Sequence, residues 1–301
     1  MAAATMPYRA ALALALWSAA WPAYAGAASH ADVPDLAEVT VVAPRPVTAA
    51  EIGGSSVPTF VRAHGNPSFR TGQLSRWETA ICASTMGLTQ NFNDYVTARI
   101  QTVAAAIFKP PAMMTPCKPN VLVIFTTAPQ QLMDNVATKQ PQLLGFHFVS
   151  EVPKLKTVNR PIQAWYVTAS KSGADVAVDD IWGGAPVGPR LGSRLYTNVR
   201  SSFVFVLVVA DTAKMNGYPI GAISDYVAVL ALAKPRNLDG CGQLPSIFDL
   251  LAPACKTERS DTITAGDVAY LRALYKMYPE QPLGMQQAAI ADIMMEQFKA
   301  P

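Results

Sequence analysis

Two consecutive apolar segments constrain the fold of this chain more than any other feature. Residues 203–210 (FVFVLVVA) form an eight-residue apolar run, which suits a buried strand and is too short to cross a membrane. Residues 221–233 (GAISDYVAVLALA) follow, and their apolar side chains would cover most of the circumference of a helix. A helix that is apolar nearly all round lies inside a core. The chain must therefore build its core around this strand and helix, and its 50% of hydrophobic residues are ample for that.

The remaining periodic segments predict the rest of the domain. Apolar residues recur at helical spacing in 90–108, before two prolines end that helix. Thr264, followed by Asp267 three residues later, is a variant of the capping box that begins helices. The expected order is strand 75–88, helix 90–108, strand 120–127, helix 129–145, strands 161–170 and 201–211, helix 221–233 and two C-terminal helices. This order predicts an α+β fold with a mixed sheet and a helical C-terminal part.

The first residues have the features of a secretory signal peptide. Arg9 provides a positive charge, residues 10–20 are apolar, and Ala23-Tyr24-Ala25 fits the small-residue cleavage site. We expect cleavage after Ala25, so that residues 1–25 are removed and the mature chain has no transmembrane segment. The alternative, an uncleaved anchor, would need about 20 apolar residues. This predicts a periplasmic or secreted protein.

Residues 26–67 are rich in Ala and Pro, and we interpret them as a flexible tether before a single domain at 68–301. The chain has 24 basic and 21 acidic residues, and they are interspersed rather than grouped in blocks. A charge balance this close to neutral gives no electrostatic reason to expect a nucleic-acid partner.

Four cysteines remain in the predicted mature chain: Cys82, Cys117, Cys241 and Cys255. An even number of cysteines behind a signal peptide indicates two disulfides, for which three pairings exist. We favour the two local pairings, Cys82–Cys117 and Cys241–Cys255. A metal or redox site is the alternative, but the chain has no C-x-x-C motif.

The order of elements resembles the N-terminal half of the zincin metalloproteases. In that family a twisted sheet carries two long helices, and the second helix bears the zinc-binding motif. The segment 245–251 (PSIFDLL) resembles the turn that follows the zinc site, and 263–275 (ITAGDVAYLRALY) resembles the family's C-terminal helix. The resemblance covers residues 70–290 and implies a zincin-like fold.

The zinc-binding chemistry of that family is missing from this sequence. His-Glu-x-x-His places two imidazoles on one helix face, where they bind zinc, and its Glu activates the bound water. On the corresponding frame this chain has Ser224, Asp225 and Ala228. The three histidines, His30, His64 and His147, all lie earlier in the chain, and we interpret them as structural. We therefore expect no metal and no cofactor, and we interpret Asp225 as a helix-start residue.

These features predict an exported, non-catalytic binding or accessory protein of the cell envelope, with a peptide or an envelope protein as its partner. Zincins bind peptides by adding a strand to a sheet edge, which requires no zinc. Two alternatives remain open. One is a non-metallo hydrolase that uses carboxylates such as Asp225 and Asp211, and the other is a structural envelope component.

Two further regions are candidates for ligand contact. Trp165 and Tyr166 are consecutive in a predicted strand, so they should point to opposite faces of the sheet, and one of them could line a groove. The loop WGGAPVGPRLGSR contains Trp182, Arg190 and Arg194, which could bind an anion or a sugar. A core role for the tryptophan and a plain connecting role for the loop are the alternatives.

Overall fold

The computed structural model describes residues 55–109, 116–172, 177–178, 198–255 and 259–299. All of them belong to one compact unit, Val42–Pro301. The predicted signal peptide and most of the predicted tether lie outside the described residues. The same is true of Trp182, Arg190 and Arg194 in the Gly/Pro-rich loop.

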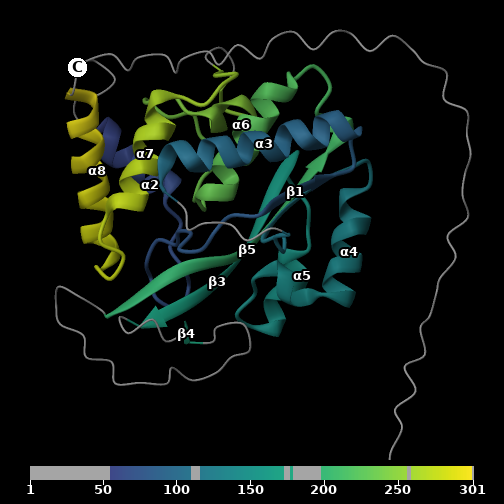
Figure 1. Cartoon of the computed structure of the whole chain (residues 1–301), viewed down its shortest axis with the longest axis horizontal. Helices are drawn as coiled ribbons and strands as arrows, with labels where there is room; N and C mark the ends of the chain where they lie inside the picture. Colours follow the sequence, from purple (N-terminus) through teal and green to yellow (C-terminus); the bar gives the residue numbers. More distant parts are fainter. Residues whose placement is uncertain (1–54, 110–115, 173–176, 179–197, 256–258, 300–301) are drawn as a thin grey trace, which may run out of the picture. The chain divides into compact units, whose positions relative to one another are not determined.

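A five-stranded mixed sheet forms the centre of the unit (Figure 1). Its spatial order is β1-β2-β5-β3-β4, with β1, β2 and β5 parallel to one another and β3 antiparallel to both β5 and β4. The apolar run identified in the sequence lies in β5, between β2 and β3, which explains why both of its faces are apolar. The strands are β1 (Ala83–Met86), β2 (Val121–Thr126), β3 (Ile162–Ser172), β4 (Ala177–Val178) and β5 (Val199–Asp211).

Helices cover both faces of the sheet. Alternate residues of β5 point to opposite sides: Val206 and Val208 enter the main core, whereas Leu207 and Val209 enter a smaller second core. The main core is built with α2 (Ser56–His64), α3 (Gln90–Ile107), α6 (Ile220–Leu232), α7 (Ala265–Lys276) and α8 (Leu283–Lys299). The second core is covered by α4 (Pro129–Lys139), the 3-10 turn η1 (Pro141–Leu144) and α5 (Val152–Leu155). The predicted α+β class with a mixed sheet is therefore confirmed.

The first described helix lies in the range that we expected to be tether. In α2, Val57, Phe60 and Val61 recur at helical spacing, and all three are buried in the main core. Gly65 follows the helix and ends it. The compact domain therefore begins no later than Ser56, and the predicted boundary at residue 68 is too late.

The strand expected at 75–88 is also shorter than predicted. Only Ala83–Met86 forms β1, and Arg76 makes a single bridge to Ser202 on β5. Apart from that bridge, side chains in the first half of this segment form hydrogen bonds with the ends of helices. The Arg76 guanidinium donates to the carbonyl oxygens at the end of α7, those of Leu274, Tyr275 and Met277, at 2.9–3.3 Å.

Both favoured disulfide pairings are confirmed: Cys82 is bonded to Cys117, and Cys241 to Cys255. The first joins the residue before β1 to the segment that leads into β2. The second closes the loop between α6 and α7. Among the described residues, no helix is both long and apolar enough to cross a membrane.

Candidate functional site

The three α6 residues that the sequence resemblance aligns with a zinc-binding motif are closed to solvent. Ser224, Asp225 and Ala228 lie on α6 with 0%, 3% and 0% of their surfaces exposed. The Ser224 hydroxyl donates to the carbonyl of Ile220, one turn earlier on the same helix, at 2.6 Å. No ligand can reach these side chains while α6 stays packed.

Asp225 is a structural anchor rather than a helix-start residue. Because α6 begins at Ile220, Asp225 lies in its second turn. One carboxylate oxygen pairs with Nε of Arg99 on α3, and this bond raises the pKa of Arg99. The other accepts from the Thr262 hydroxyl at 3.0 Å and from the backbone N–H of Ile263 at 2.8 Å. Both oxygens are therefore occupied in holding α6 against α3 and the segment before α7.

Asp211, the second carboxylate considered for hydrolysis, also serves the fold. One of its oxygens accepts from the N–H of Ala213 at 3.1 Å, which caps the turn after β5. The other lies 3.4 Å from the ammonium of Lys214.

The buried C-terminal end of α6 is completed by aromatic side chains. The last carbonyls of a helix have no partner within the helix, so a buried end needs outside donors. Trp77 Nε1 donates to the carbonyl of Ala231 at 2.7 Å, and the Tyr275 hydroxyl donates to that of Leu232 at 3.0 Å. The Tyr166 hydroxyl on β3 lies 3.0 Å from the carbonyl oxygen of Leu230 and 3.2 Å from that of Ala233.

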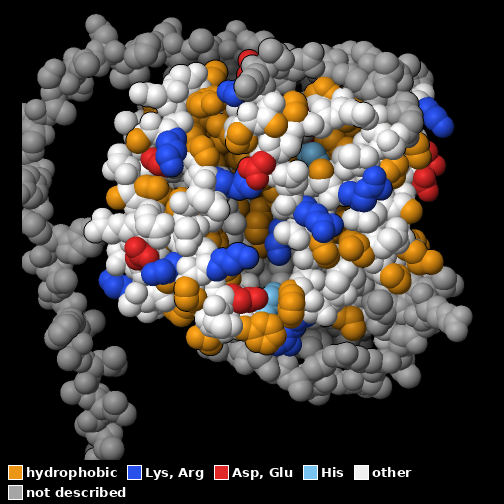
Figure 2. All heavy atoms as spheres, turned by 180° about the vertical axis from the view of Figure 1, so that it is seen from behind, with side chains coloured by type: hydrophobic (Ala, Val, Ile, Leu, Met, Phe, Trp, Pro, Cys, Tyr) orange, Lys and Arg blue, Asp and Glu red, His pale blue; other side chains and the backbone are white. Residues whose placement is uncertain are grey.

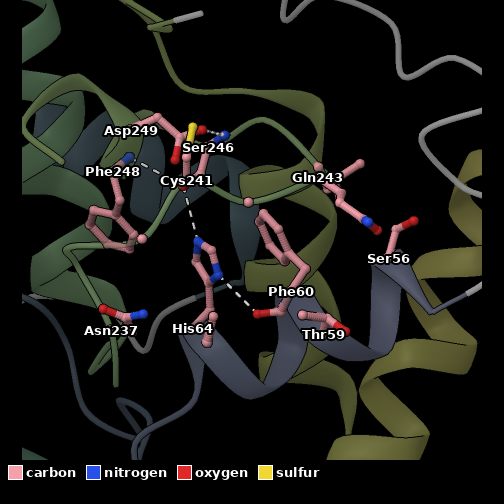
Figure 3. A pocket seen from close by; sticks show the side chains of 14 residues that line it. Ser56, Thr59, Phe60, His64, Asn237, Cys241, Gln243, Ser246, Phe248 and Asp249 are labelled. Atoms are coloured by element: carbon pink, nitrogen blue, oxygen red, sulfur yellow. Dashed lines mark hydrogen bonds between the residues drawn. The ribbon is translucent and has the colours of Figure 1, made fainter. Parts of the chain in front are cut away.

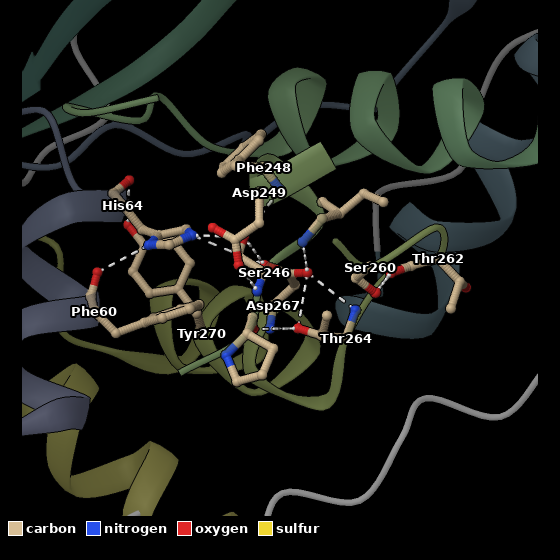
Figure 4. A network of polar contacts seen from close by, with 12 residues as sticks. Phe60, His64, Ser246, Phe248, Asp249, Ser260, Thr262, Thr264, Asp267 and Tyr270 are labelled. Atoms are coloured by element: carbon tan, nitrogen blue, oxygen red, sulfur yellow. Dashed lines mark hydrogen bonds and ion pairs between the residues drawn. The ribbon is translucent and has the colours of Figure 1, made fainter. Parts of the chain in front are cut away.

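A buried polar network joins α2, the turn at 246–250 and α7 (Figure 4). Asp267 is fully buried, and its two oxygens accept from the Ser246 hydroxyl at 2.7 Å and from the backbone N–H of Ile247 at 2.8 Å. His64 completes the network. Its Nε2 lies 3.0 Å from the Ser246 hydroxyl, and its Nδ1 lies 2.9 Å from the carbonyl oxygen of Phe60.

The hydrogen count of this network distinguishes it from a nucleophile–base pair. The Phe60 carbonyl can only accept, so His64 Nδ1 carries a proton. The single Ser246 proton goes to Asp267, and the hydroxyl also accepts from the N–H of Phe248. One added proton on His64 would let Nε2 donate to the hydroxyl and satisfy every contact. Burial lowers the pKa of His64, while the charge of Asp267 and the bond to Phe60 oppose that shift. Ser246 is thus a fully engaged structural hydroxyl.

A cavity of about 150 Å³ lies beside this network, between α2 and the loop closed by the Cys241–Cys255 disulfide (Figure 3). Thr59, Phe60, Asn237 and Asp249 are among the residues that line it. Burial raises the pKa of Asp249 to about 6. Asp249 and the two cysteine sulfurs lie within 4.8 Å of one another, but the sulfurs are bonded to each other, so no thiolate is present to bind a metal.

The outer edge of β3 offers unpaired backbone groups. The N–H of Asp211 on β5 donates to the carbonyl of Pro161 at 2.8 Å. Because the direction of backbone groups alternates along a strand, Ile162, Ala164 and Tyr166 direct theirs away from β5. Within the described part of the chain, no strand pairs with this outer side before Ser170. Ala164 and Tyr166 are half-buried.

The segment after η1 packs directly against this edge. A Cβ on Gly145 would lie 2.0 Å from the carbonyl oxygen of Tyr166, and the φ angle of Gly145 is +64°. Only glycine fits both conditions. The close approach covers the Tyr166 carbonyl but brings residues 146–149 to one side of the open edge.

Three rings near this edge form what we call the aromatic patch: Phe69, His147 and Phe148. The ring centroid of Phe69 lies 5.2 Å from that of His147 and 5.6 Å from that of Phe148. Phe69 and Phe148 are 64% and 56% exposed, which is unusual for phenylalanine. The patch therefore joins the segment after α2 to the segment after η1.

Lys234 follows a residue that contacts β3. Its carbonyl accepts from the N–H of Asn66 at 2.8 Å, and the preceding residue, Ala233, contacts Tyr166 of β3. Lys234 is partly buried, and this burial lowers its pKa. No described acidic group pairs with it. Figure 2 shows, on the face seen from behind, exposed hydrophobic side chains in a hollow, with both basic (Lys, Arg) and acidic (Asp, Glu) side chains around it.

The expectation for Trp165 is only half right. Trp165 and Tyr166 do point to opposite faces of the sheet, but Trp165 is 3% exposed and belongs to the second core. Its indole N–H donates to the carbonyl of Leu155 at 2.7 Å. It is therefore a core residue and does not line a groove.

Comparison with family models, with curated proteins and with solved structures gives no match for this chain.

Proposed function

We propose that this protein is an exported, non-catalytic binding protein with a metalloprotease-like fold, which holds an extended peptide along the outer edge of β3. A mixed sheet with α3 and α6 packed together on one face agrees with the zincin resemblance. The two disulfides suit an oxidising compartment.

The motifs behind the resemblance also form one structural unit, which supports the proposal. Ser246 and Ile247, in the segment that resembles the turn after the zinc site, both bond to Asp267 in the helix that resembles the family's C-terminal helix. The helix between β5 and this turn is packed on all sides and has no zinc ligand at the motif positions. A fold of this kind without the two histidines of the zinc-binding motif favours binding over hydrolysis by that family's mechanism.

The observation that carries the proposal is the unpaired outward side of β3 at Ala164, two residues before the Tyr166 carbonyl that Gly145 covers. The N–H and the carbonyl of Ala164 offer hydrogen bonds to an added strand, and side chains near the edge can select its sequence. The carboxylates considered for the hydrolase alternative have partners that hold the fold together. No observation on the described residues favours that alternative over peptide binding.

The substitution Ala164→Pro tests the proposal directly. Proline removes the outward N–H without removing a hydrogen bond to β5, because edge strands tolerate proline on the unpaired side. Ala164→Val is the matched control, since it keeps the N–H and suits a strand. Peptides would be selected from a displayed library of random heptamers on the oxidised mature protein and then measured by fluorescence anisotropy.

We expect Ala164→Pro to weaken the selected peptides at least tenfold and Ala164→Val to change their affinity less than twofold. Circular dichroism and thermal unfolding would check that both variants keep the fold. Equal affinity for both variants, or a library with no enriched peptide, would contradict strand addition at this edge.

A further inference from the structure

We infer that the bound peptide presents an acidic side chain to Lys234 and an apolar side chain to the aromatic patch. This inference rests on the proposed function and specifies the class of peptide. Its observations are separate from the open backbone edge, because they concern one cation and one exposed group of rings near it.

Lys234 is a partly buried lysine without a described carboxylate partner. Removing an ammonium group from water without a counter-charge is unfavourable. Arg160 and Lys156, by comparison, pair with Asp239 and Asp134. In the described structure no carboxylate forms an ion pair with Lys234, and burial lowers its pKa. A carboxylate of a bound peptide would form a charge-assisted hydrogen bond with Lys234 in this partly desolvated site.

The position of Lys234 makes an acidic side chain a better partner than a peptide terminus. The Tyr166 side chain leaves the sheet on the main-core face, and its hydroxyl contacts Ala233, the residue before Lys234. The backbone at Lys234 therefore lies on that face of the sheet. Side chains of an added strand alternate between the two faces, so one of them can reach Lys234, whereas the strand's ends stay in the plane of the sheet.

The aromatic patch provides the second contact. Gly145 touches the edge at Tyr166, and Phe148 follows Gly145 by three residues. The chain between Gly145 and Phe148 therefore spans about 11 Å at most. Phe69 is three residues from Asn66, which is bonded to Lys234. Exposed rings that already contact each other lose little freedom when a further apolar group covers them. A peptide of four or five residues is long enough to reach both contacts.

The test is a double-mutant cycle on the peptides selected above. A peptide with Glu or Asp would be made again with Gln or Asn, and both forms would be measured against the wild-type protein and Lys234→Met. Lys139→Met, an exposed lysine on α4, is the control for the loss of one charge. Phe148→Ala tests the aromatic patch, and its exposure makes retention of the fold expected.

We expect Lys234→Met to weaken the acidic peptide about tenfold and the neutral form less than twofold, with no effect of Lys139→Met. Phe148→Ala should weaken both forms at least fivefold. Equal losses for the acidic and neutral forms would overturn the pairing with Lys234. Loss of binding on amidation of the peptide's C-terminus, with its acidic side chain kept, would overturn the assignment to a side chain.

The two proposals fail in different ways. If the selected peptides depend on Ala164 but not on Lys234 or Phe148, this inference is wrong and strand addition stands. If they depend on Lys234 and are indifferent to Ala164→Pro, peptides bind at this surface without joining the sheet, and the proposed strand addition is wrong.

Discussion

At the scale of single residues, the Arg99–Asp225 pair is the clearest case of a polar contact that holds helices together. The side chains are 18% and 4% exposed, so the pair is more buried than exposed. Breaking a buried pair by removing one partner leaves a charge without compensation. We therefore expect Arg99→Met to lower the free energy of unfolding by about 2–4 kcal/mol.

Urea denaturation would measure this loss, with Lys156→Met as the control. Lys156 pairs with Asp134 at 3.0 Å, but both side chains are well exposed, so that variant should lose less than about 1 kcal/mol. The double variant of Arg99→Met with Asp225→Asn should be more stable than the sum of the two single losses predicts. Strictly additive losses would mean that the two side chains do not interact.

Asp249 gives a pH-dependent prediction at the same scale. Burial is the main cause that raises its pKa to about 6, above the ordinary value of 3.8. The folded state therefore holds this proton more tightly than the unfolded state does. The stabilisation is fully present below about pH 4 and is lost as the pH rises towards 6.

Asp249→Asn should remove this dependence while its side-chain oxygen still accepts from the N–H of Ser246. Relative to wild type, the variant should gain about 1–2 kcal/mol between pH 4 and pH 7. Denaturation at four pH values for both proteins isolates the effect, because the opposing contribution of His64 is common to them. A constant difference across this range would show that Asp249 titrates normally.

Sequence reasoning at the residue scale succeeded where chemistry alone decides. Cysteines in an oxidising compartment pair, and short separations along the chain selected the two observed bonds. Asp225 was misinterpreted, because its nearness to the start of an apolar helix gave no sign of Arg99, 126 residues away. His64 contacts Ser246 across 182 residues, and no local pattern predicts such a contact.

At the scale of elements, α6 depends on the side chains that complete its C-terminal end. Trp77→Phe would leave the buried carbonyl of Ala231 without its donor, and Tyr275→Phe would do the same at Leu232. An unsatisfied buried acceptor costs about 1–3 kcal/mol, so each variant should be destabilised by that amount. Tyr278→Phe is the control, because Tyr278 is 70% exposed and should change little. Chemical denaturation would rank them, and equal stability of all three would refute the capping role.

The elements that the sequence predicted well are long and strongly periodic. Helices α3, α6 and α7 lie within a residue or two of their expected bounds. Helix α2 was missed because three large apolar residues in nine, inside an Ala/Pro-rich stretch, give too weak a signal. The length of the strand at 75–88 was overestimated because the side chains of Arg76 and Trp77 donate hydrogen bonds to the last carbonyls of α7 and α6. Strand propensity cannot reveal such long-range hydrogen bonds.

At the scale of the molecule, the proposed binding edge illustrates what a sequence hides. Its contacts come from β3, from the segment after η1, from Phe69 and from Lys234, which are far apart along the chain and meet only in the fold. The mixed sheet was predictable from the order of elements. The outer position of β3 was not, because strand order depends on pairings that local patterns do not specify.

The two disulfides should contribute unequally to the stability of the whole domain. Cys82–Cys117 joins residues 35 apart, and the loop that it closes contains α3. Cys241–Cys255 joins residues 14 apart. If each bond mainly restricts the unfolded chain, its stabilisation grows slowly with the loop that it closes, to about 4 and about 3 kcal/mol. A variant with Cys82→Ala and Cys117→Ala should therefore be less stable than one with Cys241→Ala and Cys255→Ala.

Thermal and urea unfolding of the two variants, with and without reductant, would measure the difference. Reductant should destabilise each variant through its remaining bond and leave a protein without cysteines unaffected. The Cys82–Cys117 bond lies at the β1 end of the sheet, opposite β3, so its loss should reduce stability without weakening peptide binding at the β3 edge. A variant that stayed folded but lost the peptide would show that the binding edge depends on the whole sheet rather than on β3 and its neighbours.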